Sequence, residues 1–119
     1  MRLTDAQWPV MEVLWTGEAF SLKQITQALK TVNNWNKNTV YTYLIRMAEK
    51  GLVRIDHDSP QPYSAAISRE ECARTERQEL LHRVYGGAAG DLIAAFLKDS
   101  AITPQEAARL KKLLDEMEV

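Results

Sequence analysis

Four predicted helix starts each have a Ser or Thr that is followed three positions later by Gln or Glu, the capping-box pattern. The pairs are Thr4 and Gln7, Ser21 and Gln24, Ser68 and Glu71, and Thr103 and Glu106. In such a box the hydroxyl accepts a hydrogen bond from the third helical amide, and the later side chain accepts one from the capping residue's amide. Four marked helix starts within 119 residues predict a mainly helical fold.

The first part of the chain predicts three helices. The first should run from Asp5 to Trp15 and stop at Gly17, with a distorted first turn, because Pro9 lacks the amide that would bond the carbonyl four residues earlier. The third should run from Lys37 to Lys50, and Gly51 supplies a left-handed exit. Apolar residues spaced by three and four predict the inward faces of the three helices. These are Ala6, Val10, Val13 and Leu14; Ile25, Ala28, Leu29 and Val32; and Val40, Tyr43, Leu44 and Met47.

After Gly51 the hydrophobic pattern changes from a helical period to the alternation of strands. Residues Leu52–Ile55 and Pro62–Ile67 predict two short strands joined by a loop of turn-forming residues. Three helices followed by a hairpin is the order of a winged helix. We therefore expect residues 1–67 to form a winged helix-turn-helix domain, although the same lengths fit a small α+β domain of another design.

Residues 68–119 predict three further helices, from Arg69 to Tyr85, from Ala89 to Lys98 and from Pro104 to Met117. The Gly86-Gly87 pair ends the first of them. About forty residues in three helices cannot enclose their own apolar faces. A second copy of the chain is the simplest cover, and two-fold symmetry is the commonest arrangement. The alternative is that these helices fold back onto the first domain. The residues expected at the dimer interface are Leu80, Leu81, Val84, Leu92, Phe96, Leu110 and Leu114.

Composition excludes several classes of protein. At 45% apolar and 26% charged residues the chain is an ordinary globular one. No apolar run approaches the roughly 20 residues that span a bilayer, and no basic stretch precedes an apolar one at the N-terminus, so we expect a cytoplasmic protein. Cys72 is the single cysteine, and His57 and His82 have no acid or nucleophile at a suggestive spacing. With no phosphate loop or metal motif, the sequence predicts neither an enzyme nor a cofactor.

The third predicted helix carries both local positive charge and groups able to read bases. The net charge is −1, yet residues 37–54 hold four basic residues and one acid. Once its apolar stripe faces inward, the helix turns Asn38, Thr42, Ile45, Arg46 and Glu49 outward, with Thr39 and Tyr41 on the flanks. Asn can bond adenine, Thr offers a hydroxyl and a methyl, and Arg can bond guanine or phosphate. An ordinary solvated helix face has a similar composition.

An ordered set of residues extends over nearly the whole chain. It comprises Ala6-Gln7-Trp8, Val10-Met11, Leu14-Trp15, Trp35, Thr39-Val40, Thr42, Leu44, Arg46, Lys50-Gly51-Leu52 and Tyr85-Gly86-Gly87. In this set, from about residue 3 to residue 117, the chain closely resembles the penicillinase repressor family of bacterial transcription regulators. The resemblance implies a winged-helix N-terminal domain, a helical C-terminal dimerisation region and binding to palindromic operators. It also implies relief of repression through a membrane sensor peptidase, which triggers cleavage of the repressor.

By position, the resemblance places Asn38, Thr39, Tyr41, Thr42 and Arg46 on the recognition helix and makes the hairpin around His57 the wing. The chain departs from the family pattern at several points. Asn38 stands where family members often have Lys, and the wing carries Asp56 and Asp58, which should repel phosphates.

Two further departures concern the C-terminal region. Inducible members resembling this chain are cut at an Asn-Phe bond in the penultimate helix, and the corresponding bond here is Ala95-Phe96. The four C-terminal cysteines of copper-responsive relatives are absent. The sequence therefore leaves proteolytic relief open and excludes copper sensing through such a set.

The leading hypothesis is a homodimeric repressor that places one recognition helix of each copy in a major groove, with half-sites about 34 Å or a multiple apart. Lys37 and Arg46 should bind phosphate, and Asn38, Thr39 and Thr42 should read bases. A protein-interaction module with the same fold is the alternative, and it would respond less to salt than a DNA complex. A regulator gated by a small molecule would need a pocket between the domains.

Overall fold

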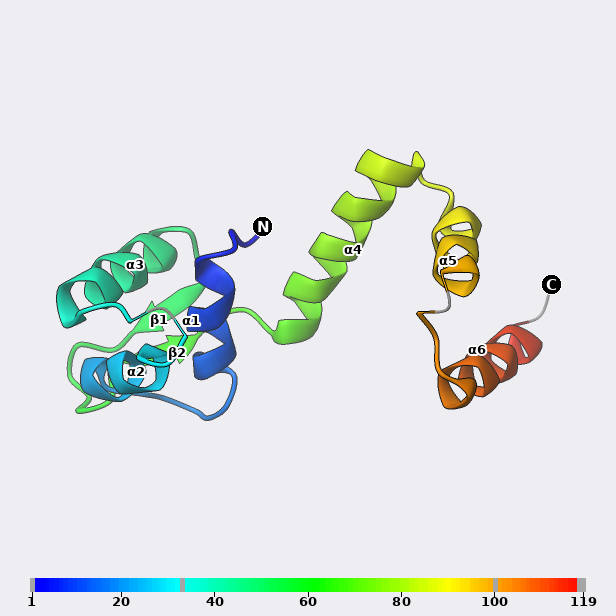
Figure 1. The fold of residues 1–119 in the computed structure, drawn as a ribbon. Helices are drawn as coiled ribbons and strands as arrows, with labels where there is room; N and C mark the ends of the chain where they lie inside the picture. Colours follow the sequence, from blue (N-terminus) through cyan, green and yellow to red (C-terminus); the bar gives the residue numbers. More distant parts are fainter. Residues whose placement is uncertain (1, 33, 100, 118–119) are drawn as a thin grey trace. The chain divides into compact units, whose positions relative to one another are not determined.

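The computed structural model describes residues 2–32, 34–99 and 101–117 (Figure 1). In chain order the elements are α1 (Gln7–Leu14), α2 (Leu22–Leu29), α3 (Lys37–Glu49), β1 (Val53–Ile55), β2 (Tyr63–Ala65), α4 (Arg69–Tyr85), α5 (Ala89–Lys98) and α6 (Pro104–Glu116). The chain divides into two compact units, Met1–Arg77 and Gln78–Val119. Three helices followed by a hairpin confirm the predicted mainly helical, winged-helix architecture. The assignment of residues 68–119 to a dimerisation domain stays a prediction.

Helix α1 begins at Gln7 rather than at Asp5, and Pro9 explains the shift. Thr4 and Gln7 exchange the predicted pair of bonds, with N–O distances of 2.9 and 3.3 Å, and this pair closes a turn through Asp5 and Ala6. Pro9 then lies in the first helical turn, where an amide needs no partner within the helix. The irregular first turn expected from Pro9 is therefore present as a turn at Asp5 and Ala6, and the regular helix begins only after it.

Two of the other capping boxes are complete, and one is partial. Ser21 with Gln24 and Thr103 with Glu106 each form both bonds of the box. At the start of α4 the Glu71 amide donates to the Ser68 hydroxyl at 3.1 Å, but the return bond comes from that hydroxyl and not from the Ser68 amide. The local signals thus located these three helix starts correctly.

The hairpin is antiparallel and shorter than predicted, with Val53 opposite Ala65 and Ile55 opposite Tyr63. The sequence did not reveal a third participant. Phe20, in the segment before α2, forms an isolated bridge with Tyr63 through bonds of 2.8 and 3.0 Å. This bridge attaches the hairpin to the helical part of the domain and satisfies backbone groups at one edge of the small sheet.

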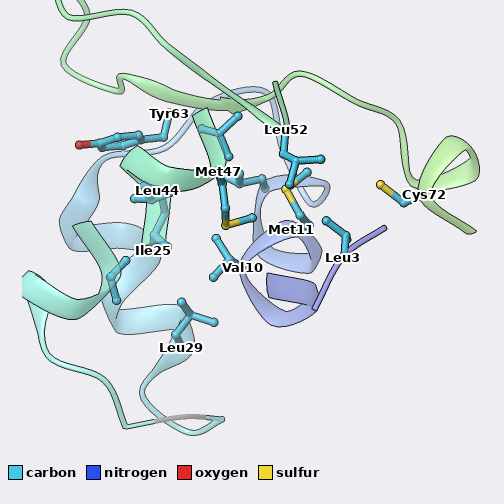
Figure 2. Packing of buried hydrophobic residues seen from close by; sticks show 13 residues of the cluster. Leu3, Val10, Met11, Ile25, Leu29, Leu44, Met47, Leu52, Tyr63 and Cys72 are labelled. Carbon is cyan, nitrogen blue, oxygen red and sulfur yellow. The ribbon is translucent and has the colours of Figure 1, made fainter. Parts of the chain in front are cut away.

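The core of the first unit lies where α1, α2, α3 and the hairpin meet (Figure 2). Its fully buried side chains include Met11, Ile25, Leu29, Leu44 and Met47. The prediction for α2 was partly wrong. Val32 is 61% exposed because α2 ends at Leu29 and Val32 lies beyond it, and Ala28, within α2, is exposed as well.

The start of α4 packs on the first unit. Cys72 is buried, the Trp15 indole donates to the Ile67 carbonyl at 2.9 Å, and Arg69 pairs with Glu12 at 3.2 Å. The ion pair is exposed and contributes little. The buried thiol and the indole bond therefore hold this end of α4 in place.

The second unit has a different internal structure. Gly86 and Gly87 adopt φ values of +56° and +88°, and this left-handed backbone, which favours glycine, ends α4 as predicted. Neither α5 nor α6 contains a buried residue. Most of the large apolar side chains on these two helices are exposed in a single copy: Ile93, Phe96, Leu97, Leu113 and Leu114.

Candidate nucleic-acid interface

Helix α3 has an apolar inner face and a polar outer face. Val40, Leu44 and Met47 are fully buried, and their spacing of four and three places them on one stripe. The outer face is exposed at Lys37, Asn38, Thr42, Arg46 and Glu49. Core packing therefore fixes the rotation of the helix and presents the predicted polar residues to solvent.

The flanks of this outer face differ from one another. Tyr41 is 46% exposed, whereas Thr39 and Ile45 are half-buried. The expectation that Ile45 faces fully outward is therefore wrong, since Ile45 lies at the border between the two faces. Thr39 is also held through its backbone, because its amide donates to the Asn36 side chain at 2.9 Å.

Asn36 is the N-cap of α3, which the sequence reasoning missed. Its side chain satisfies one of the amides that have no partner within the helix. The signal was present, because Asn is a preferred capping residue. No capping box marks this position, since residue 39 is Thr and not Gln or Glu.

The polar groups on the outer face retain free bonding capacity. The Thr42 hydroxyl donates to the Asn38 carbonyl at 3.0 Å, which leaves its oxygen able to accept and its methyl exposed. Within the described part of the chain, neither Lys37 nor Arg46 forms an ion pair. Both cations can therefore meet phosphate without first breaking an intramolecular pair.

The wing has an acidic tip that is ordered by its own bonds. The Asp58 amide donates to the Asp56 carboxylate at 3.1 Å, and both acids, like His57, are exposed. At the end of this loop the Gln61 side chain donates to Gln24 of α2 at 3.3 Å, a link the sequence did not reveal. The tip therefore presents negative charge, as predicted, on a loop that is attached to α2.

Two ionisable groups of the first unit have raised pKa values. Burial raises the pKa of the Tyr63 phenol, and electrostatic interaction with Tyr41 raises it further. Burial is also the main cause that raises the pKa of the Cys72 thiol. Tyr63 therefore adds no negative charge near α3 at neutral pH, and Cys72 stays a protonated, poorly nucleophilic thiol.

The residues predicted at the dimer interface lie on α4, α5 and α6. Val84, Phe96 and Leu114 are 58%, 48% and 58% exposed. The others are half-buried: Leu80, Leu81, Leu92 and Leu110. Within the second unit, α5 and α6 also border an apolar groove of about 630 Å³. Its lining includes Ile93, Leu97, Leu110, Leu113, Leu114 and Met117.

The described residues do not form two other kinds of site. No three or more His, Cys, Asp and Glu side chains among residues 2–32, 34–99 and 101–117 gather in a way that could hold a metal ion. No helix in this part of the chain has the length and apolar character needed to cross a membrane.

The family model described as penicillinase repressor matches residues 3–116. The chain belongs to the penicillinase repressor family. This membership makes it a winged-helix, DNA-binding transcriptional repressor and confirms the resemblance seen in the sequence. Its relatives are regulators of transcription, not enzymes.

Individual relatives of this penicillinase repressor family member are distant in sequence. The methicillin resistance regulatory protein MecI of Mammaliicoccus sciuri is 20% identical, over 96% of this chain and 94% of the relative. The penicillinase repressor of Staphylococcus aureus is 21% identical, over 98% of this chain and 94% of the relative. Among solved structures, a MarR/EmrR family transcriptional regulator from Acinetobacter sp. ADP1 gives a TM-score of 0.44 at 17% identity, covering 97% of this chain and 78% of that one.

Proposed function

We propose that the protein represses transcription as a homodimer that occupies a palindromic operator, with α3 of each copy in a major groove. The observation that carries this proposal is the division of α3 into a fully buried apolar stripe and an exposed polar face. A recognition helix needs both properties, because its inner side must fix the orientation in which its outer side meets base edges.

The outer face of α3 supplies two kinds of contact. Lys37 and Arg46 are exposed cations that suit phosphate, which sets affinity and register. Asn38, Thr39 and Thr42 carry the groups that suit base edges, and Tyr41 lies at the rim of the same face. The acidic wing tip does not suit phosphate, so we assign most of the binding energy to α3.

Support for the homodimer comes from the second unit. Two helices without a single buried side chain do not gain enough from packing to be stable alone. A second copy supplies the missing cover through a self-complementary apolar surface that includes Phe96 and Leu114. This assembly also doubles the number of recognition helices on one duplex.

The proposal includes relief of repression by cleavage within α5. The family resemblance implies cleavage triggered by a membrane sensor peptidase, and the corresponding bond joins Ala95 and Phe96 within α5. The Asp99 amide donates to the Ala95 carbonyl at 3.0 Å, so the bond lies inside a hydrogen-bonded helix that must open before a peptidase can bind it. Co-expression with such a peptidase should yield a fragment ending at Ala95, and a chain that stays intact while repression is relieved would exclude this route.

A salt titration of DNA binding tests the proposed function. The parent chain and Arg46→Ala are titrated with a duplex that the parent selects from random sequence. The logarithm of affinity decreases linearly with the logarithm of salt concentration. Arg46→Ala should make this decrease shallower by about 0.9 for each phosphate that is no longer neutralised. A dimer that loses one contact per copy would lose two phosphate contacts. Arg74→Ala, which removes an exposed arginine from α4, is the matched control and should retain the parent slope.

Either of two results would contradict the proposal. Equal slopes for the parent and Arg46→Ala would remove α3 from the interface. Failure of the parent to enrich any duplex, with no salt dependence, would favour a protein-interaction module instead.

A further inference from the structure

Two aromatic rings stack at the N-terminal side of α3. Trp35 lies in the turn before the helix, next to the capping residue Asn36, and Tyr43 lies within the helix. Their ring centroids are 4.5 Å apart and the planes are inclined by only 5°. Both side chains are half-buried and pack against the core. The stack therefore joins the turn of the helix-turn-helix to the helix that follows it.

The first turn of α3 is weakly stabilised by its own sequence. It contains no acidic residue to favour the positive end of the helix dipole, and Lys37 places a cation there. Its side-chain cap is the bond between Asn36 and the Thr39 amide. Before the helix, Asn34 has a left-handed φ of +51°. The stack adds a tertiary contact to the cap at the start of the helix.

This weak turn carries residues for which position matters most. The N-terminal residues of a recognition helix are those that contact base edges. Binding groups need to be held to within about 0.5 Å of the productive geometry. Asn38 and Thr42 lie on the part of α3 that extends from this turn to the stacked Tyr43. A shift of the first turn would lower sequence selectivity more than overall affinity, because base contacts specify the sequence whereas charge attraction to phosphate does not depend on it.

We propose that Trp35, through its stack on Tyr43, is a positioning residue that sets the sequence selectivity of α3 without itself reading bases. This inference rests on the proposed function. The stack fixes the first turn of the helix, so Asn38 and Thr42 meet the bases in one arrangement. Losing the stack lowers selectivity and leaves the electrostatic part of DNA binding in place.

The test compares the affinity for a duplex that the parent selects from random sequence with the affinity for a scrambled duplex of the same length. Trp35→Leu keeps apolar bulk and removes the ring, and Tyr43→Leu does the same from the other side. Each should lower the ratio of the two affinities about tenfold, and the double variant should lower it no further, because both act through one contact. The salt slope should not change. Trp35→Phe and Tyr43→Phe, which keep a ring, should restore most of the ratio.

The control is the other aromatic pair of the same unit. Trp8 and Trp15 meet edge to face, with centroids 5.9 Å apart and planes inclined by 65°. Trp8→Leu should lower the midpoint of urea unfolding but leave the affinity ratio of the folded protein unchanged. An equal loss of selectivity in Trp8→Leu would show that general destabilisation is the cause and would overturn the inference.

Other outcomes separate the inference from the proposed function. Unchanged selectivity in Trp35→Leu would overturn the positioning role while leaving the repressor proposal intact. A loss in Trp35→Phe as large as in Trp35→Leu would overturn it as well, since the indole N–H and not the stack would then be the group in use. If the parent selects no sequence, the proposed function itself fails.

Discussion

The two compact units of this repressor differ in what a single copy can bury. The first unit, Met1–Arg77, encloses a contiguous core in which large side chains such as Met11, Leu44 and Met47 are less than 2% exposed. The helices of the second unit that lie wholly within it, α5 and α6, bury none. Both units carry apolar stripes at helical spacing in the sequence. The difference shows that an apolar stripe predicts that a surface will be covered, but not which chain covers it.

This difference suits a DNA-binding protein. A self-contained first unit holds the recognition helix in a fixed orientation, whether or not a partner is present. If the second unit pairs with a second copy, as proposed, tight operator binding depends on that pairing. Substitutions in either unit can break that contrast, and the largest effect is expected in the core of the first.

Leu44→Ala should destabilise the first unit by about 2–5 kcal/mol, because it leaves a cavity among fully buried side chains. The measurement is the free energy of unfolding of this unit in urea, followed by tryptophan fluorescence, since all three tryptophans lie within it. The loss should be the same at low and high protein concentration. A loss that shrinks as concentration rises would show that the first unit is not self-contained.

Leu114→Asp should weaken dimerisation about 100-fold, because it would place a carboxylate on the surface proposed to pair with a second copy. Sedimentation equilibrium measures the dissociation constant. Lys112→Asp makes a charge change on the same helix without removing an apolar side chain, and it should leave the dimer nearly intact. A parent chain that is monomeric at high micromolar concentration would contradict the dimer altogether.

The two complete capping boxes provide a matched pair across the units. Ser21→Ala and Thr103→Ala each remove one box and should each cost about 1 kcal/mol. The stability lost in Ser21→Ala should not depend on protein concentration. The stability lost in Thr103→Ala should depend on it, because that helix belongs to the unit proposed to dimerise. Ser21→Thr and Thr103→Ser keep the hydroxyl and should restore most of each loss. Identical concentration dependence in the two alanine variants would remove the contrast.

The smallest effect concerns alkaline pH. Burial raises the pKa of Tyr63 above its ordinary value of 10.0, so the folded state binds its proton more tightly than the unfolded state. The resulting stability is fully present below pH 10 and is lost as pH rises through the folded pKa. Between pH 9 and 11 the free energy of unfolding in urea should therefore decline with rising pH in the parent, and this decline should be shallower in Tyr63→Phe. An equal decline in the parent and in Tyr63→Phe would show that other ionisable groups cause the loss of stability.

Local features of the fold could be predicted from the sequence, and long-range ones could not. Hydroxyl caps and apolar spacing identified every described helix, because both act over three or four residues. The bridge between Phe20 and Tyr63 and the bond between Gln24 and Gln61 join distant segments, and no local pattern signals either one. Pro9 was correctly interpreted as incompatible with a regular helix from Asp5, but the chain accommodates it by starting α1 later.

In the candidate site, too, local features could be predicted from the sequence and long-range ones could not. The outer face of α3 was predictable because its inner stripe fixes the rotation of the helix. The half-buried state of Ile45 was not, because it depends on neighbours from other elements. Asn36 is a preferred capping residue, but it falls outside the two-residue pattern that identifies a capping box. The stacking of Trp35 on Tyr43 could not be predicted either, since eight positions along the chain do not by themselves bring two rings together.

The most direct test of the account asks which base pairs change when one residue of α3 changes. Duplexes are selected from random sequence by the parent and by Thr42→Asn. We expect the parent to select an inverted repeat, and the variant to change its preference at symmetric positions in both halves of that repeat. Selection of the same sequence by both proteins, or of a site without two-fold symmetry, would contradict it.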